Sequence, residues 1–188
     1  MRRRDLVTGV LAALLAGSLP ALAQEKTPNE VRAEIRQMRQ ATLDQLYKEV
    51  PQARKTIRGA AGYAVFESVG AQLLFVGGAG GSGVVRDNLT GKDTYMKMAS
   101  AGVGLGLGVK DTRLVFVFKK RDALKHFVDE GWQFGGQTSA AAKSDAQGAS
   151  SGELEVADGI TVYQLTKTGL IAQASVQGTK YWKDETLN

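Results

Sequence analysis

The chain has 188 residues, of which 43% are apolar and 23% are charged, with 23 glycines, one histidine and no cysteine. This apolar fraction is enough for a packed core and excludes a wholly disordered chain, and the length suggests a single domain. The missing cysteines exclude disulfides, a thiol nucleophile and cysteine-ligated metals, and the lone His126 excludes sites built from several histidines.

The first 23 residues have the composition of a signal peptide. Three arginines at positions 2–4 precede an apolar stretch at residues 6–19, which is short for a membrane span. Ala-Leu-Ala at residues 21–23 fits a cleavage site, so we expect the mature chain to begin at Gln24 and to reach the periplasm, in solution or peripheral to a membrane. The arginine pair also fits a twin-arginine signal, and both export routes stay open. Intact-mass measurement of the exported protein checks cleavage, and a mass that includes the first 23 residues contradicts it.

Removal of this segment leaves 21 basic and 18 acidic residues. The excess lies in residues 24–58, which have eight basic and five acidic side chains, whereas residues 59–188 have 13 of each. A modest, localised positive charge suits an anionic phospholipid surface. This charge is much smaller than the strong stripe of basic residues that is typical of nucleic-acid-binding proteins, so we expect no nucleic acid as a partner.

Residues 24–58 are predicted to form an N-terminal helical segment. Thr27, Pro28 and Glu30 make a capping box with proline at the first helical position, and Pro51 ends the helix. Apolar side chains recur near helical spacing, with three arginines beside them, and residues 52–58 suggest a second short helix. Two interpretations stay open: an amphipathic helix that touches a membrane, or a helix docked on the domain with solvated arginines.

Residues 59–188 are predicted to form a β-rich domain. Turns are expected at residues 88–91 and 110–112, and a helix is expected near residues 121–130 that ends at Gly131. The fold class is therefore α+β: a mainly antiparallel, strongly curved or barrel-like β-sheet with an N-terminal amphipathic helix and one internal helix. The runs that favour strands are residues 63–66, 72–76, 84–86, 94–98, 103–109, 113–118, 132–142, 160–165 and 170–176.

Glycine alternates with apolar residues over residues 102–109, so one face of this predicted strand has no side chains. Close packing against a helix or another backbone, or tight curvature of the sheet, explains this pattern better than a row of glycines beneath a ligand. Residues 78–83 match G-x-G-x-x-G, but a strand and a turn follow where a dinucleotide site needs a helix. The sequence contains no credible catalytic constellation, and we expect no bound metal and no organic cofactor.

Several motifs, in this order, resemble the SYLF domain family. They are GAAGYAVF at residues 59–66, GGAGGSGV at 77–84, FGGQTS at 134–139, TGLIA at 168–172, QGT at 177–179 and the final Asn188. The resemblance covers about residues 30–188. A Tyr-Tyr-Gly-like ending common in that family is absent here.

The resemblance implies a non-catalytic lipid-binding module. Eukaryotic members of the family bind phosphoinositides with help from an N-terminal amphipathic helix, some yeast members bind and bundle actin filaments, and bacterial members are exported or membrane-attached. We therefore expect binding to an anionic phospholipid surface in the cell envelope. A periplasmic protein-interaction or scaffold domain and a small β-barrel carrier of an acyl chain remain alternatives, and the oligomeric state stays open.

Two basic clusters are candidate lipid contacts. The first is Arg32, Arg36 and Arg39 on the predicted helix, and it ranks higher because its segment has the net positive charge. Replacing these three with glutamine is expected to weaken liposome binding on the order of 100-fold and to leave the fold intact, because none is expected to be buried. The second, where a strand meets the internal helix, consists of Lys119, Lys120, Arg121 and Lys125.

Overall fold

The computed structural model describes residues 26–73, 76–102, 108–134, 153–157, 159–166, 169–170 and 179–188. The expected signal peptide and the glycines at positions 104 and 106 lie outside these residues, as do most of the strands expected at 132–142 and 170–176. The three helices are α1 (Pro28–Glu49), α2 (Ala53–Gly59) and α3 (Arg121–Asp129). The strands are β1 (Gly62–Leu73), β2 (Val76–Asp87), β3 (Asp93–Gly102), β4 (Gly108–Phe118), β5 (Trp132–Phe134), β6 (Glu153–Ala157), β7 (Ile160–Thr166), β8 (Gly169–Leu170) and β9 (Thr179–Lys183).

The local signals at the helix ends are confirmed. The Thr27 hydroxyl accepts from the Glu30 amide, and the Glu30 carboxylate accepts in return from the Thr27 amide, as a capping box requires. The short second helix follows directly after Pro51. Gly131 adopts φ +73° just beyond α3, a conformation that favours glycine and ends the helix.

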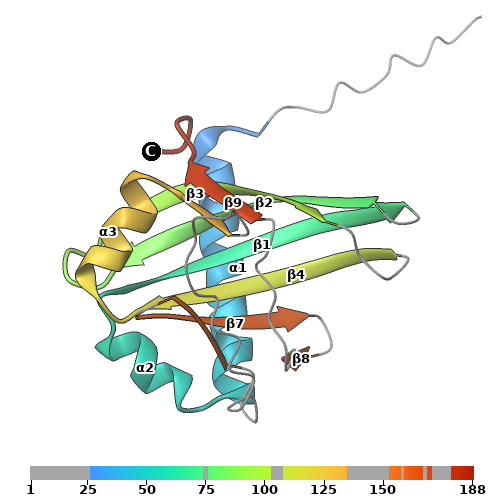
Figure 1. Ribbon diagram of the computed structural model, residues 1–188. Coiled ribbons are helices and arrows are strands. Elements are labelled where there is room, and N and C mark those ends of the chain that lie inside the picture. Colours follow the sequence, from blue (N-terminus) through green and yellow to red (C-terminus); the bar gives the residue numbers. More distant parts are fainter. Residues whose placement is uncertain are drawn as a thin grey trace, which may run out of the picture.

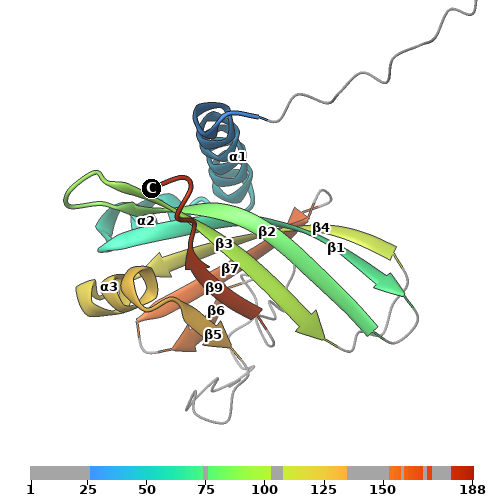
Figure 2. The same cartoon turned by 90° about the horizontal axis from the view of Figure 1, so that it is seen from above.

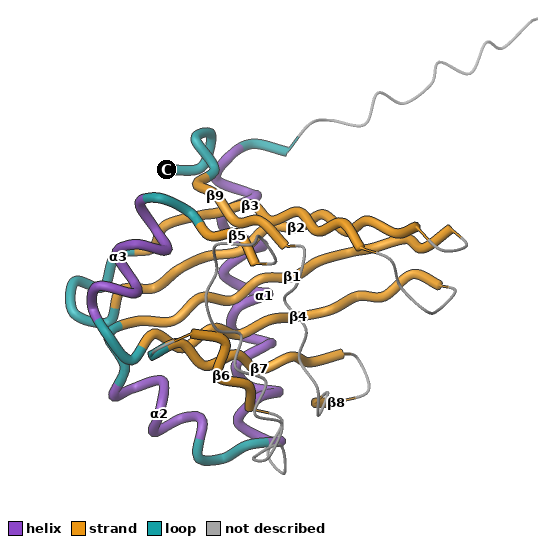
Figure 3. Tube along the Cα trace, in the orientation of Figure 1, coloured by secondary structure: helices purple, strands orange, loops and turns teal. Residues whose placement is uncertain are grey.

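The strands form one antiparallel sheet in the order β5-β9-β3-β2-β1-β4-β7-β6, with β8 beside β7. The sheet is strongly curled (Figures 1 and 3), which confirms the predicted fold class. The turn at residues 88–91 is confirmed between β2 and β3. Two local predictions were wrong: residues 110–112 lie inside β4 instead of forming a turn, and most of the strand expected at 72–76 belongs to the ends of β1 and β2. The reason is that β1 pairs with β2 and with β4 along nearly its whole length. The hydrogen bonds of this pairing make the strands longer than the short apolar runs seen in the sequence.

Each face of the sheet carries its own core (Figure 2). On the outer face, α1 and α2 place Leu46 and Ile57 against Val65, Val115 and other residues of the central strands. A smaller cluster of Ile35, Val84, Tyr95 and Leu187 continues this contact toward the C-terminus. The apolar stripe of α1 is therefore buried against the sheet. Of the two interpretations of this helix, the docked helix is the one observed.

Aromatic side chains fill the inner face beside α3. The Phe116 ring centroid lies 5.3 Å from that of Tyr181 and 5.6 Å from that of Phe127 on α3. The Phe66 ring occupies the position that a Cβ at Gly83 would take on the neighbouring strand. Glycine in this part of β2 thus makes room for an aromatic ring, which is a packing role.

Candidate functional site: the basic end of the sheet

The three arginines of α1 are held by the protein itself. Arg32 donates to the carbonyl oxygen of Leu187 at 2.8 Å, and Arg36 donates to the Tyr95 hydroxyl at 2.9 Å. Arg39 forms an ion pair with Asp93 at 2.8 Å, and both side chains are only 16% exposed. None of the three is fully buried, as expected, but Arg32 and Arg39 are only partly exposed because the polar edge of α1 also faces the sheet.

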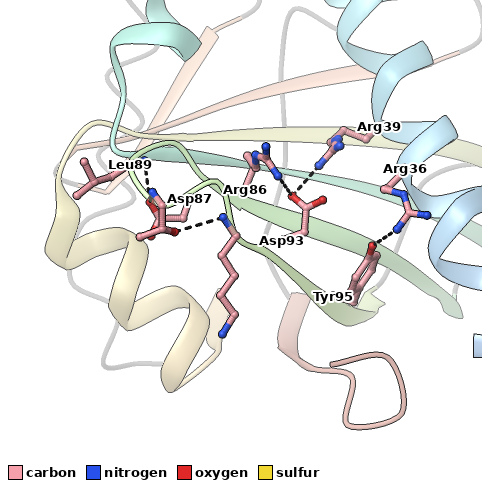
Figure 4. Close-up of polar contacts among 9 residues, drawn as sticks. Arg36, Arg39, Arg86, Asp87, Leu89, Asp93 and Tyr95 are labelled. Carbon is pink, nitrogen blue, oxygen red and sulfur yellow. Dashed lines mark hydrogen bonds and ion pairs between the residues drawn. The ribbon is translucent and has the colours of Figure 1, made fainter. Parts of the chain in front are cut away.

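Asp93 accepts from two arginines at once. Arg86 on β2 approaches the same carboxylate oxygen at 3.0 Å as Arg39 does from α1 (Figure 4). This cluster joins the helix to the β2–β3 hairpin across the outer face. A partly buried charge with two partners is costly to uncouple, since removal of the acceptor leaves two cations unpaired.

The C-terminal residues complete this contact. The Asn188 side chain accepts from the Tyr95 amide and donates to the carbonyl oxygens of Tyr95 and Asp184, all within 2.9 Å. Leu187 is buried beside Ile35 of α1. Arg32 thus contacts the C-terminal segment itself, and Arg36 contacts Tyr95, which this segment holds through hydrogen bonds. Both arginines therefore help to fix α1 on the sheet. Lipid contact by the first cluster stays a prediction.

The second predicted cluster lies at one end of the sheet, where β4 enters α3. Lys119, Lys120 and Lys125 are exposed. Arg121 instead makes two hydrogen bonds of 2.6 Å to both carboxylate oxygens of Asp87, on the β2–β3 hairpin. The hydrogen bonds from Arg121 hold the pKa of Asp87 well below its usual range. This pair ties α3 to the hairpin and neutralises Arg121.

Two further segments meet the second cluster at this end. Figures 1 and 2 place α2, the start of α3 and the β2–β3 turn together, away from the glycine-rich ends of the long strands. The Asn88 side chain donates to the carbonyl oxygens of Ile57 and Ala60, which joins the turn to the end of α2. We call the exposed basic residues gathered here the basic end: Arg54, Lys55, Arg58, Lys92, Lys119, Lys120 and Lys125.

The basic end has little acidic charge to offset it. Within residues 53–59, 88–92 and 119–125, all of which the structure describes, Asp122 is the only exposed acidic residue against seven exposed basic ones. Asp129 and Glu130, at the far end of α3, are also exposed, and they contact Lys183 and His126 respectively. The exposed surface of α1 is different. There, Glu30, Glu34, Asp44 and Glu49 outnumber the three exposed basic residues of positions 26–49. The positive charge that the sequence locates in residues 24–58 is therefore presented by α2, and α1 contributes none of it.

Sequence reasoning missed four cations of the basic end: Arg54, Lys55, Arg58 and Lys92. A usable signal existed, because residues 50–66 contain no acidic residue and three basic ones. The contribution of Lys92 had no local signal, since only the hairpin brings it near α2. Sequence reasoning also missed Leu89, a residue at the tip of that hairpin that is 80% exposed.

Neither a metal centre nor a membrane-spanning helix is found in the described part of the chain. No group of three or more histidine, aspartate or glutamate side chains there is placed to hold a metal ion. Among the same residues, none of the helices is both long enough and apolar enough to cross a bilayer.

A curled antiparallel sheet with a helix packed across its outer face and exposed cations gathered at one end defines an α+β domain with a basic surface. Residues 99–188 match the family described as "Ysc84: Las17-binding protein actin regulator". Together with the relatives below, this match shows that the chain belongs to the SYLF (Ysc84) family, which the order of the sequence motifs indicated.

The relatives come from a bacterium and from yeast. The chain is 34% identical to "Beta cell expansion factor A" of Aeromonas veronii over 171 residues, which covers 90% of this chain and 63% of that one. It is 32% identical over 130 residues to "LAS seventeen-binding protein 3" and 31% identical over 131 residues to "Protein YSC84", both of Saccharomyces cerevisiae. Each yeast alignment covers 65% of this chain and 28% of the relative. The chain thus spans about two thirds or less of the curated relatives that it matches.

Proposed function

We propose that this chain is a non-catalytic module of the cell envelope that binds anionic phospholipid at a membrane surface through its basic end. The observation that carries the proposal is the charge there: seven exposed basic side chains against one exposed acidic one, drawn from three separate segments. Near an anionic membrane each basic residue contributes about 1 kcal/mol, and salt screens this attraction. The relatives carry the names of binding and regulatory factors, which agrees with a role other than catalysis.

Binding at the surface fits the packing better than an enclosed acyl chain does. In the described half of the inner face, Phe66, Phe116, Phe127 and Tyr181 pack with ring centroids between 4.8 and 6.1 Å apart. Close-packed aromatic rings leave no room there for a lipid chain. The outer face beneath α1 is equally filled by the second core.

The test is co-sedimentation with vesicles of phosphatidylglycerol and phosphatidylcholine over a salt series. We expect the triple variant Arg54→Gln, Lys55→Gln, Arg58→Gln to bind on the order of 100-fold more weakly than the unmodified chain at low salt, since three cations are lost. All three residues are exposed, whereas Ala53 and Ile57 of α2 are buried, so the fold should be retained. Arg54 also lies over the Tyr47 ring at 4.3 Å, so circular dichroism of the variant accompanies the binding measurement.

The matched control removes the same charge elsewhere, by Lys26→Gln, Lys48→Gln and Lys180→Gln, all exposed and outside the basic end. It should lose little affinity. Equal weakening in both variants would show a general charge effect and reject the basic end as the site. Failure of the unmodified chain to sediment with anionic vesicles at low salt would reject lipid binding itself.

A protein partner is the second candidate. One yeast relative is named "LAS seventeen-binding protein 3", and the matched family is described as "Las17-binding protein actin regulator". The structure also presents a partly exposed tryptophan. Trp182 on β9 is 37% exposed and lies opposite Lys97 of β3. Exposed tryptophan is typical of protein interfaces. A protein-binding domain would ignore vesicles of every composition in the same assay and would lose its partner on Trp182→Ala.

A further inference from the structure

The tip of the β2–β3 hairpin presents an apolar side chain in the middle of the basic end. Leu89 is 80% exposed, compared with 37% for the exposed Trp182. Figure 4 shows its side chain directed away from the sheet and from α1. A single exposed leucine is ordinary by itself, so the inference depends on what holds and surrounds this one.

The tip is held by its polar neighbours. Asp87 accepts from the Leu89 amide at 2.9 Å and from the Thr90 amide at 3.2 Å, while Arg121 clamps the same carboxylate from α3. Asn88 ties the next position to α2. Gly91 takes φ +70°, which closes the turn. The hairpin is therefore fixed to two helices, and little conformational entropy remains to be lost when its tip meets a ligand.

The charges near the tip indicate which kind of ligand the tip would contact. Lys92 follows in the same turn, Arg58 lies at the end of α2 that Asn88 contacts, and Lys119 lies at the β4–α3 junction. A bilayer with anionic headgroups offers negative charge for these cations and, a few ångströms deeper, an apolar layer for the leucine. An exposed apolar tip at the same end of the molecule as these cations fits a surface of this kind.

We propose that Leu89 is an apolar anchor that enters the interfacial layer of an anionic bilayer while the surrounding cations lie at the headgroups. This assignment rests on the proposed function and adds an apolar contribution to a surface otherwise held by charge. Salt screens the electrostatic part and leaves the apolar part. The anchor should therefore govern the binding that survives at high salt.

The first experiment replaces the anchor and measures vesicle affinity across the salt series. We expect Leu89→Ser to weaken binding about tenfold, as burial of part of a leucine side chain predicts, and to abolish the part that resists salt. Leu89→Met keeps the apolar volume and should bind like the unmodified chain. The hydrogen bonds of Asp87 and Asn88 are unchanged in both variants, so both should fold.

The second experiment reports depth directly. Leu89→Trp should show blue-shifted fluorescence and quenching by vesicles whose acyl chains are brominated near the glycerol, beyond the signal of Trp132 and Trp182 in the unmodified chain. The anchor would be rejected, and surface binding retained, by two results together. Leu89→Ser would bind vesicles as tightly as the unmodified chain at every salt concentration, and Leu89→Trp would show no additional quenching. Absence of vesicle binding by the unmodified chain would overturn both, so the two failures are distinguishable.

Discussion

Replacing Phe116 with alanine is expected to lower the free energy of unfolding by about 3–5 kcal/mol. Phe116 is fully buried and contacts the rings of Phe66, Phe118, Phe127 and Tyr181, so its removal opens a cavity where β1, β4, β9 and α3 meet. Partial collapse cannot refill this space, because the neighbouring rings are fixed by three strands and a helix. Denaturant unfolding followed by circular dichroism measures the loss.

The conservative variant Phe116→Leu is the control, and it should lose less than half as much because most of the volume is kept. A loss below about 1 kcal/mol in Phe116→Ala would contradict the packed inner face. The same variant tests the acyl-carrier alternative. Mass spectrometry of the purified, unmodified protein detects any bound lipid. If lipid is present there and remains bound in both variants, an acyl chain can be enclosed despite the aromatic core.

The triple variant Arg32→Gln, Arg36→Gln, Arg39→Gln is expected to destabilise the fold by about 3 kcal/mol, which reverses the expectation drawn from the sequence. Each arginine donates a hydrogen bond to the sheet or to the C-terminal segment, and hydrogen bonds of charged groups contribute about 1.5–3 kcal/mol when buried and less when partly exposed. Glutamine is too short to reach the same acceptors. Thermal and denaturant unfolding at neutral pH measure this effect.

The α2 triple variant supplies the comparison, because it removes the same number of cations from exposed residues, of which only Arg54 has a described side-chain contact, over the Tyr47 ring. We expect the α1 variant to lose stability and to retain vesicle binding under native conditions, and the α2 variant to show the opposite. Weakened vesicle binding in a fully stable α1 variant would return the lipid site to the first cluster and contradict the assignment made here.

Features encoded by neighbouring residues could be predicted. The capping box at Thr27, the end of the first helix at Pro51, the turn at residues 88–91 and the stop at Gly131 each depend on contacts within about four residues, and the structure confirms them. The antiparallel, curled sheet followed from many short β-rich runs separated by turns. The family followed from the order of its motifs.

The direction in which charged side chains point could not be predicted. On α1, an amphipathic helix with arginines beside its apolar stripe fits a membrane and a sheet equally well, and only the positions of Asp93, Tyr95 and Leu187 decide for the sheet. These acceptors are distant in the sequence, so no local pattern contains them.

The basic end likewise exists only in the folded chain. Its cations lie on α2, on a hairpin and at the β4–α3 junction, and chain folding through β1, β2 and β4 brings them together. Local hydrogen bonding and side-chain periodicity therefore set the helices, turns and sheet class. The docking of α1 and the site itself depend on the pairing of strands that are distant in the sequence. This pairing determines which charged side chains bind partners within the protein and which remain exposed at its surface.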